Sequence, residues 1–235
     1  DIMVHCHWEY DVRTAIQIAE AVAPIKPLWF EDGMIVNYTD SWKRLTASSP
    51  VPICTGENFY TTHGFRELVE KQAADIISPD LAKAGGLLEG RKIADLAELY
   101  YIPFCPHNIC GPIGTMAATH VCAAVPNFQV LEFHHLDNEI WSGLLVEQNL
   151  IQDGHIQVTT SPGLGVTLNE AAAKAASADN LGFFKLGLDQ VTHSRARARV
   201  CLRIRVRVNL PTADPTPTPT QVTNSAYRRL EKDGH

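Results

Sequence analysis

The sequence lacks an apolar run of about 18 residues, the length that a membrane-spanning helix needs. It also lacks a basic excess, because 20 lysines and arginines stand against 26 aspartates and glutamates, which gives a net charge of −6 at pH 7. A surface that binds nucleic acid is normally rich in lysine and arginine. We therefore expect neither a membrane nor a nucleic acid as a partner.

Cys-x-x-Cys pairs are absent as well, although the chain contains 6 cysteines. Such pairs are typical of zinc and redox sites, and several of these cysteines lie instead inside apolar runs. We interpret them as reduced core residues and expect a cytoplasmic protein. No signal-peptide pattern opens the chain, and its start at Asp1 without a methionine leads us to expect a fragment of a longer protein.

Six short apolar runs each end in an ionisable side chain. These side chains are His5, Glu31, Glu57, Asp80, His107 and Glu132, at steps of 23 to 27 residues. Residues 11–23 and 87–100, which lie between runs, have the apolar spacing of helices. Alternating strands and helices indicate a parallel sheet, and the steps are close to the roughly 30 residues of each unit in an eightfold barrel.

The carboxyl ends of all strands in such a barrel meet on one face, so residues far apart in the sequence can form one site. This pattern favours an α/β fold, a partial (β/α)8 TIM-type barrel of about six units. An open doubly wound sheet is the alternative, although it would use only the point where its strand order reverses. Because a closed barrel needs eight strands, we expect the first two strands to be missing upstream.

The domain boundaries follow from changes in composition. We predict a barrel domain over residues 1–170 and a terminal helix or appendage over residues 171–185. Residues 144–158 could form a small β-ribbon, which we interpret as an appendage after the barrel and not as a barrel strand. Residues 186–235 contain alternating arginines and then Pro-Thr repeats, which lack the apolar content to pack. We interpret this segment as a disordered, non-functional tail, while its arginine-rich part could also be an amphipathic strand that meets an anionic partner.

Glu31 and Glu57 predict a metal site. Two carboxylates at neighbouring strand ends would repel each other without a cation, and hard oxygen ligands suit Mg²⁺ or Mn²⁺. The alternative is a structural role, in which either glutamate pairs with an arginine or caps a helix. Asp80 and His107 predict a general base, because a carboxylate bonded to one imidazole nitrogen raises the basicity of the other. Histidine in this context can also be purely structural.

Three further residues are weaker candidates. His5 and His7 stand two positions apart, so both could lie on the same face of a strand end, one as a metal ligand and the other as an acid. Glu132 could donate a hydrogen bond to a developing oxyanion or orient the His107–Asp80 pair.

Together these segments resemble a known family. The motifs HCHWEYD, WFED, CTGEN, SPDLAKAGG, PHNICGP, VLEF and PGLGV are similar to the barrel domain of the enolase superfamily, in its mandelate racemase and muconate lactonizing branch. Within that branch, the likeness is to acid-sugar dehydratases. The resemblance covers about residues 1–170 and rests on the ordered series more than on any one motif. It implies an N-terminal capping domain that closes over the substrate, which we expect to be missing here together with the first two strands.

The resemblance implies a metal-assisted removal of the proton next to a sugar-acid carboxylate, followed by loss of water. It implies that Glu31 and Glu57 bind Mg²⁺, that His107, supported by Asp80, is the base, and that His7 protonates the leaving hydroxyl. Glu132 would lie near the substrate carboxylate. A small sugar acid is thus the expected partner, and we expect the full-length form to be a homo-oligomer.

The sequence departs from the family pattern at His5, where the family has a metal-binding aspartate. Histidine is a softer, neutral ligand, so it would favour Mn²⁺ or another transition metal over Mg²⁺. Two alternatives to a dehydratase therefore stay open. One is a catalytically inactive fragment of such an enzyme, and the other is a racemase or epimerase, which would need an upstream lysine.

Overall fold

The computed structural model describes residues 1–134, 141, 143–147, 150–177 and 204–209, the last of these as backbone only. Its first part repeats a strand followed by a helix. The elements are β1 (Met3–His5), α1 (Val12–Val22), the short helix η1 (Ala23–Ile25), β2 (Trp29–Glu31), α2 (Asp40–Ser48), β3 (Ile53–Thr55), α3 (Thr61–Glu70) and β4 (Ile76–Ile77). The strands pair in parallel in the order β1-β2-β3-β4, which confirms the α/β prediction with a parallel sheet.

The repeat continues through α4 (Leu81–Ala84), α5 (Leu87–Glu98), α6 (Pro112–Ala124) and β5 (Leu131–Phe133). The fifth apolar run joins the sheet only through single parallel bridges, from Phe104 to Ile77 and from Phe104 to Phe128. Pro103 and Pro106 flank this run, and a proline has no N–H to donate to a neighbouring strand. The run therefore keeps its place in the sequence of strands without forming a regular ladder.

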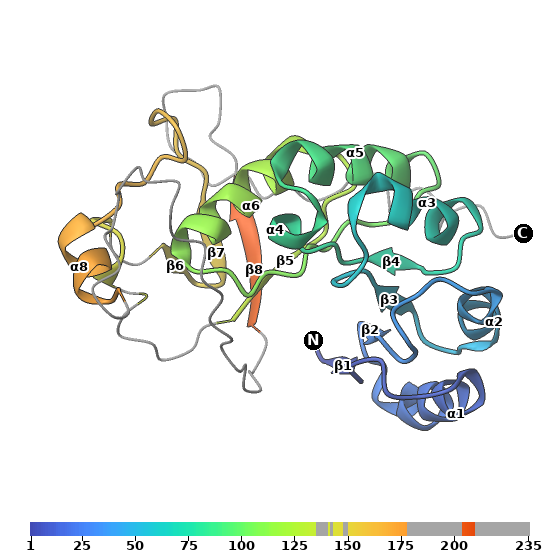
Figure 1. The fold of residues 1–235 in the computed structure, drawn as a ribbon. Coiled ribbons are helices and arrows are strands. Elements are labelled where there is room, and N and C mark those ends of the chain that lie inside the picture. The colour runs from blue at the N-terminus through green and yellow to red at the C-terminus, as the bar shows by residue number, and fades with distance from the viewer. Residues whose placement is uncertain (135–140, 142, 148–149, 178–203, 210–235) are drawn as a thin grey trace, which may run out of the picture.

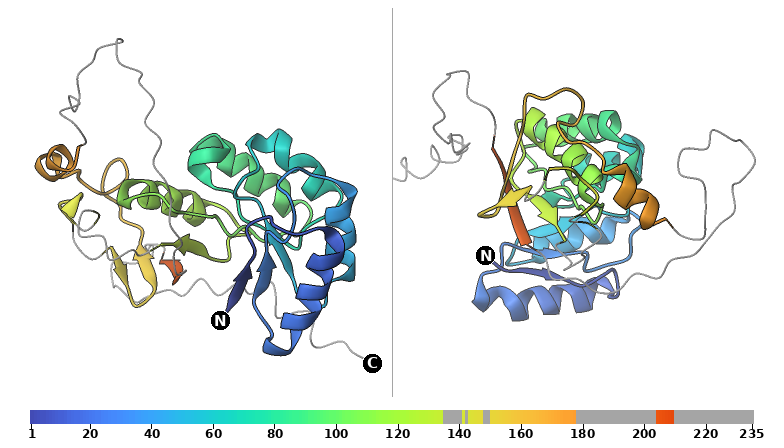
Figure 2. Two further views of the ribbon diagram at one scale, coloured as in Figure 1. Left: turned by 60° about the horizontal axis from the view of Figure 1, so that its bottom comes forward. Right: turned by 90° about the vertical axis from the view of Figure 1, so that its left-hand side faces the viewer.

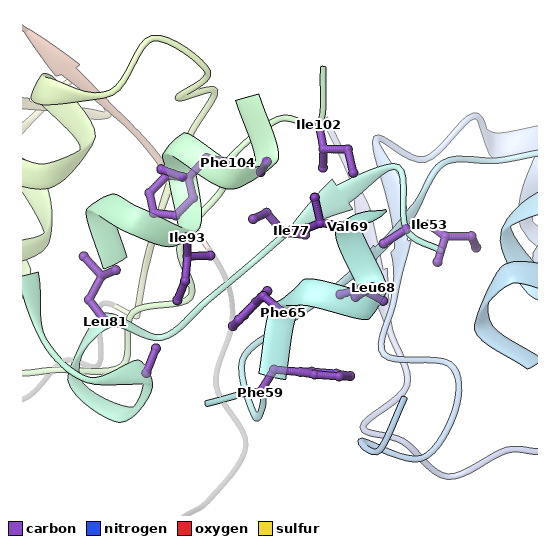
Figure 3. Close-up of a cluster of buried hydrophobic side chains, with 14 of the residues drawn as sticks. Ile53, Phe59, Phe65, Leu68, Val69, Ile77, Leu81, Ile93, Ile102 and Phe104 are labelled. Atoms are coloured by element: carbon purple, nitrogen blue, oxygen red, sulfur yellow. The ribbon is translucent and has the colours of Figure 1, made fainter. Parts of the chain in front are cut away.

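The helices follow one another around the outer side of the strands. Figure 1 shows α1, α2, α3 and α5 in an arc that covers β1 to β4, and the two views of Figure 2 show the same arrangement from other directions. Apolar residues on the helices face the strands, for example Phe65 and Leu68 of α3 and Ile93 of α5, all fully buried. Figure 3 shows these side chains packed against Ile77 and Phe104.

A second, smaller core lies on the opposite face of the strands. It contains Trp29, Cys54, Ile76, Cys105 and Val130, one residue from each of five successive strand segments. Successive strand residues point to opposite faces, so the residue two positions further along a strand points to the same side as these core residues. This alternation decides which side chains reach the candidate site.

A small second sheet follows the parallel strands. β6 (Ile151–Gln152) and β7 (His155–Gln157) form an antiparallel hairpin around Asp153 and Gly154, both with positive φ, as a tight Asp-Gly turn requires. This hairpin confirms the ribbon expected at residues 144–158. The helix α8 (Glu170–Ala175) lies at the end of the molecule opposite α2 (Figure 1).

The structure describes one short part of residues 186–235. Residues 204–209 form strand β8 (Ile204–Asn209), which pairs antiparallel with β5 and parallel with β7. Alternation of arginine with branched residues gives this stretch the pattern of a strand, which was the other interpretation of it. The rest of the segment lies outside the described residues, and so does most of the appendage expected at residues 171–185.

Among the described residues, no helix is both long and apolar enough to cross a membrane.

Candidate active site

The parallel strands carry the predicted site residues to one edge of the sheet. His5 ends β1 and lies directly opposite Glu31, which ends β2. Glu31 stands two residues after Trp29 of the smaller core, as His107 does after Cys105 and Glu132 after Val130. Strand alternation thus explains why these side chains converge above that core.

Four side chains at the ends of β1, β2 and β3 form a cluster, which we call the carboxylate cluster. It consists of His5, Glu31, Asp32 and Glu57, and one ligand atom from each lies within 4.8 Å of the others. The three carboxylates are 1%, 0% and 4% exposed, so water can screen their charges only weakly. His5 Nε2 lies 3.1 Å from Asp32 Oδ2 and 3.8 Å from Glu57 Oε2.

Neighbouring side chains hold these carboxylates in place. The indole Nε1–H of Trp29 donates a hydrogen bond of 2.7 Å to Glu31 Oε2, and the Thr55 hydroxyl donates one of 2.6 Å to Asp32 Oδ1. Such partners fix the orientation of metal ligands in proteins.

The cluster fits a divalent cation. Three buried carboxylates close together repel one another strongly, and a cation at their centre would remove that repulsion. An oxygen-rich set with one imidazole suits Mg²⁺ or Mn²⁺. The residues that would hold the ion are Glu31, Asp32 and Glu57, with His5 as a possible fourth ligand through Nε2.

His107 and Asp80 form a buried pair on the next strand ends. His107 Nδ1 lies 2.8 Å from Asp80 Oδ2, and the two residues are 3% and 1% exposed. Asp80 also caps α4, because its side chain accepts a hydrogen bond from the backbone N–H of Lys83. With Nδ1–H donated to the carboxylate, Nε2 of His107 keeps a lone pair that can accept a proton.

Both members of this pair have shifted pKa values. Burial raises the pKa of Asp80, but hydrogen bonds from His107 and from the Lys83 backbone outweigh it, so the pKa lies below its ordinary value. Burial lowers the pKa of His107, but the hydrogen bond to Asp80 and the negative charges of Glu132 and Glu57 outweigh it, so the pKa lies above its ordinary value. The pair is therefore built to stabilise a protonated imidazole next to a charged carboxylate.

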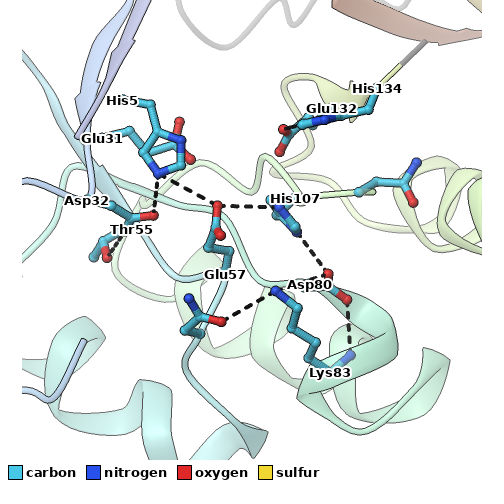
Figure 4. A network of polar contacts seen from close by, with 12 residues as sticks. His5, Glu31, Asp32, Thr55, Glu57, Asp80, Lys83, His107, Glu132 and His134 are labelled. Carbon is cyan, nitrogen blue, oxygen red and sulfur yellow. Dashed lines mark hydrogen bonds and ion pairs between the residues drawn. The ribbon is translucent and has the colours of Figure 1, made fainter. Parts of the chain in front are cut away.

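Glu57 connects the carboxylate cluster to the base. Its Oε2 lies 3.8 Å from His5 Nε2 and 3.4 Å from His107 Nε2, and Figure 4 shows it between the two rings. Lys83 lies on the other side of Asp80, with its Nζ 3.8 Å from Asp80 Oδ2 and 3.3 Å from Asn58 Oδ1. A metal-type cluster and a histidine–aspartate pair thus share one edge.

His7 lies at the exposed margin of the site. Its ring centroid is 4.0 Å from that of His5, so the two imidazoles do come together. The reason differs from the expected one, because β1 ends at His5, and His7 and Trp8 both adopt left-handed conformations, with φ of 50° and 61°. A turn, and not strand alternation, brings His7 back over His5.

The sequence predictions missed three contributors. Asp32 would point away from Glu31 in a regular strand, but its φ of 49° turns its carboxylate into the cluster. Thr55, which holds Asp32, carried no signal. His134 contacts Glu132 through Nε2 and is 8% exposed. His134 stands two residues after Glu132, and this spacing could have predicted that both side chains point to the same face of the strand.

Comparison with known proteins places the chain in a family. Residues 1–172 match the family model described as enolase C-terminal domain-like. The chain belongs to the enolase superfamily. Members of this superfamily bind a divalent metal, and the carboxylate cluster is the group of residues that could do so here.

Relatives of this enolase-superfamily chain include acid-sugar dehydratases. It is 44% identical over 175 residues to the D-xylonate dehydratase of Haloferax volcanii, covering 74% of this chain and 42% of that protein. It is 30% identical over 183 residues to a D-galactonate dehydratase of Xanthomonas campestris pv. campestris, covering 75% of this chain and 48% of that protein. The chain thus spans about half the length of the curated relatives it matches.

Solved structures agree with this assignment. The mandelate racemase/muconate lactonizing enzyme-like protein from Rubrobacter xylanophilus superimposes with a TM-score of 0.75 at 43% identity, covering 79% of this chain and 48% of that one. The expected resemblance to the mandelate racemase and muconate lactonizing branch, with acid-sugar dehydratases as homologues, is confirmed for this enolase-superfamily chain.

Proposed function

We propose that this chain carries the catalytic barrel of a metal-dependent sugar-acid dehydratase. The observation that carries the proposal is the position of His107. Its Nε2 lies 3.4 Å from a carboxylate of the metal-type cluster, while its Nδ1 is bonded to buried Asp80. A base next to a cation site is the arrangement needed to remove a proton adjacent to a carboxylate.

The substrate carboxylate would bind at the carboxylate cluster. A divalent cation held by Glu31, Asp32 and Glu57, Mg²⁺ or Mn²⁺, would supply positive charge where negative charge develops on the substrate. His107 Nε2 would accept the proton from the carbon next to the carboxylate, and the electron pair of that C–H bond would form the new C=C bond. Asp80 would hold the ring in position and stabilise the imidazolium.

Loss of water gives the enol of the 2-keto-3-deoxy acid, which tautomerises to the keto acid by moving the enol proton to carbon 3. As the C=C bond forms, the C–O bond to the neighbouring hydroxyl breaks, and His7 would donate the proton with which that hydroxyl leaves as water. His7 is at the exposed margin of the site, where a long polyhydroxy substrate can reach it. Glu132, which contacts His134, would lie near the substrate carboxylate and help to orient it.

The fold supports a finer proposal. The arc of β1 to β4, continued by Phe104 and Phe128, is what we expect of part of an eightfold barrel. The D-xylonate and D-galactonate dehydratases among the relatives make a pentonic or hexonic acid the substrate class we propose. The second candidate function is an inactive member of the family. The observation that favours it is His5, a neutral imidazole in the carboxylate cluster at the position where the family has a metal-binding aspartate.

The proposal is tested by product formation. We would incubate the chain with Mg²⁺ or Mn²⁺ and a panel of pentonic and hexonic acids, and detect the 2-keto-3-deoxy acid by mass spectrometry. Because the relatives are about twice as long, the same assay uses a chimera in which residues 1–172 replace the matching segment of the Haloferax volcanii dehydratase.

We expect the product in the chimera and its loss in the same chimera with His107→Asn. A folded chimera that binds Mn²⁺ but forms no product from any acid would contradict the dehydratase proposal and favour the inactive member.

A further inference from the structure

A second group of potential metal ligands lies beside the carboxylate cluster. His107, Glu132 and His134 each offer one ligand atom, and these atoms lie within 4.8 Å of one another. The two histidines are buried and Glu132 is half-buried. Figure 4 shows Glu132 and His134 together on the side of His107 that faces away from Asp80. We call this group the imidazole cluster.

His107 has the orientation of a metal ligand. Its Nδ1 is bonded to Asp80 Oδ2 at 2.8 Å, which leaves Nε2 with a lone pair. Metal-binding histidines in proteins usually have this carboxylate partner on the other ring nitrogen, because the partner fixes the tautomer and makes the ligand atom more basic. In the His107–Asp80 pair, Nε2 of His107 can therefore bind either a proton or a cation.

His134 supplies an independent observation. The side chain is 8% exposed, and its Nδ1 is a buried atom without a hydrogen-bond partner among the described residues. Buried polar atoms almost always have a partner, so an atom without one points to a missing ligand. His134 Nε2 contacts Glu132, and the centroids of the His107 and His134 rings are 6.2 Å apart.

We propose that the imidazole cluster is a second cation site, selective for Zn²⁺ over Mg²⁺. Two imidazoles and one carboxylate form a three-ligand set with an open position, which zinc accepts readily. The carboxylate cluster offers three carboxylates and one imidazole, so the harder Mg²⁺ or Mn²⁺ goes there. The two clusters share no residue. Glu57 of the carboxylate cluster lies between them, near both His5 and His107.

Zinc at this site would regulate the proposed reaction. The lone pair on His107 Nε2 that would accept the substrate proton is the same one that would bind zinc, so zinc and catalysis exclude each other. This consequence rests on the proposed dehydratase function, whereas zinc binding does not. Zinc would therefore act as a reversible inhibitor that competes with proton abstraction and not with Mg²⁺.

The test is calorimetric titration of the 235-residue chain with Zn²⁺ in saturating Mg²⁺. We expect one equivalent of Zn²⁺ to bind, and both His134→Gln and Glu132→Gln to weaken it by at least about 10-fold. His63→Gln, which removes an exposed imidazole on α3, is the matched control and should leave the affinity unchanged. Glu31→Gln should weaken Mg²⁺ binding but keep the zinc site.

Several results would overturn the proposal. They are displacement of Zn²⁺ by Mg²⁺, equal zinc affinity in the parent and in His134→Gln, and a sulfur-to-metal band in the ultraviolet spectrum of the Co²⁺-loaded chain, which would assign the ion to a cysteine such as Cys6. An unchanged circular dichroism spectrum shows that each variant is folded, and the variants of His134 and Glu132 should also retain Mg²⁺ binding. If zinc binds as expected while the chimera forms no product, the second site stands and the dehydratase proposal fails.

Discussion

Replacing Glu31 by glutamine should stabilise the metal-free chain and weaken its stabilisation by metal. Ligand atoms of Glu31, Asp32 and Glu57 lie within 4.8 Å of one another, and all three side chains are buried. At that separation and an effective dielectric constant of about 20, two negative charges repel each other by about 3.5 kcal/mol. Glu31→Gln removes two such pairs and keeps a carbonyl oxygen that can accept the hydrogen bond from Trp29.

Water and the neighbouring His5 imidazole reduce the repulsion, so we expect a net gain of about 1–3 kcal/mol in the free energy of unfolding in EDTA. With Mn²⁺ at about 100 times its dissociation constant, the parent should gain about 2.7 kcal/mol, and the variant much less. The stability advantage of the variant in EDTA is therefore expected to shrink or disappear in Mn²⁺.

Urea unfolding followed by circular dichroism measures both values. Glu98→Gln is the matched control, because Glu98 lies exposed on α5 and the same change of charge there should alter stability by less than about 0.5 kcal/mol. If Glu31→Gln lowers the stability of the metal-free chain, the carboxylates do not repel one another as described, and the reasoning for a cation site is refuted.

Four further predictions concern the base, the first ligand, the core and the pH dependence. In the chimera, Asp80→Asn should lower kcat by at least about 100-fold with little change in KM, because Asp80 positions His107 and stabilises its protonated form. An unchanged circular dichroism spectrum excludes misfolding, which would also lower the apparent kcat at constant KM, and a kcat close to that of the parent would contradict this role of Asp80. His5→Asp should tighten Mg²⁺ binding about 10-fold in a calorimetric titration, because an oxygen ligand replaces a softer nitrogen, and unchanged affinity would mean that this position does not coordinate. Phe65→Ala should cost about 3–5 kcal/mol in urea unfolding, because the fully buried ring fills the space between α3 and the strands, and a loss below about 1 kcal/mol would contradict the packing. The pKa of His107 in the folded protein is raised above its ordinary value of about 6.5. Its ion pairs therefore stabilise the metal-free fold fully below about pH 6.5, and this contribution is lost as the pH rises through the higher folded pKa. The difference in unfolding free energy between the parent and His107→Gln, measured in EDTA, should shrink over that range.

The sequence predicted the residues that regular strand geometry controls. His5, Glu31, His107 and Glu132 reach the site because they follow inward-facing residues of short parallel strands, and the spacing of those strands is visible in the sequence. Asp32 could not be predicted this way, because a left-handed residue reverses the direction that alternation assigns.

Long-range pairing accounts for the rest of the difference. Strand β8 comes from residues 204–209 but pairs with β5, more than 70 positions earlier, and local composition carries no information about such a partner. The Pro-Thr repeats that follow it made the whole segment resemble a tail. The pairing depends on tertiary contacts, whereas the predictions for the strand ends depend on local pattern alone.

The order of the site residues along the chain has a consequence for synthesis. His5, Glu31, Asp32 and Glu57 all come from the first three strands, whereas His107, Glu132 and His134 follow much later. On the ribosome, the oxygen-rich side chains therefore emerge and can meet a cation before His107, the proposed base, has been translated. A nascent chain that binds its ion early has the first strands aligned by it, which gives the later strands a fixed edge on which to add.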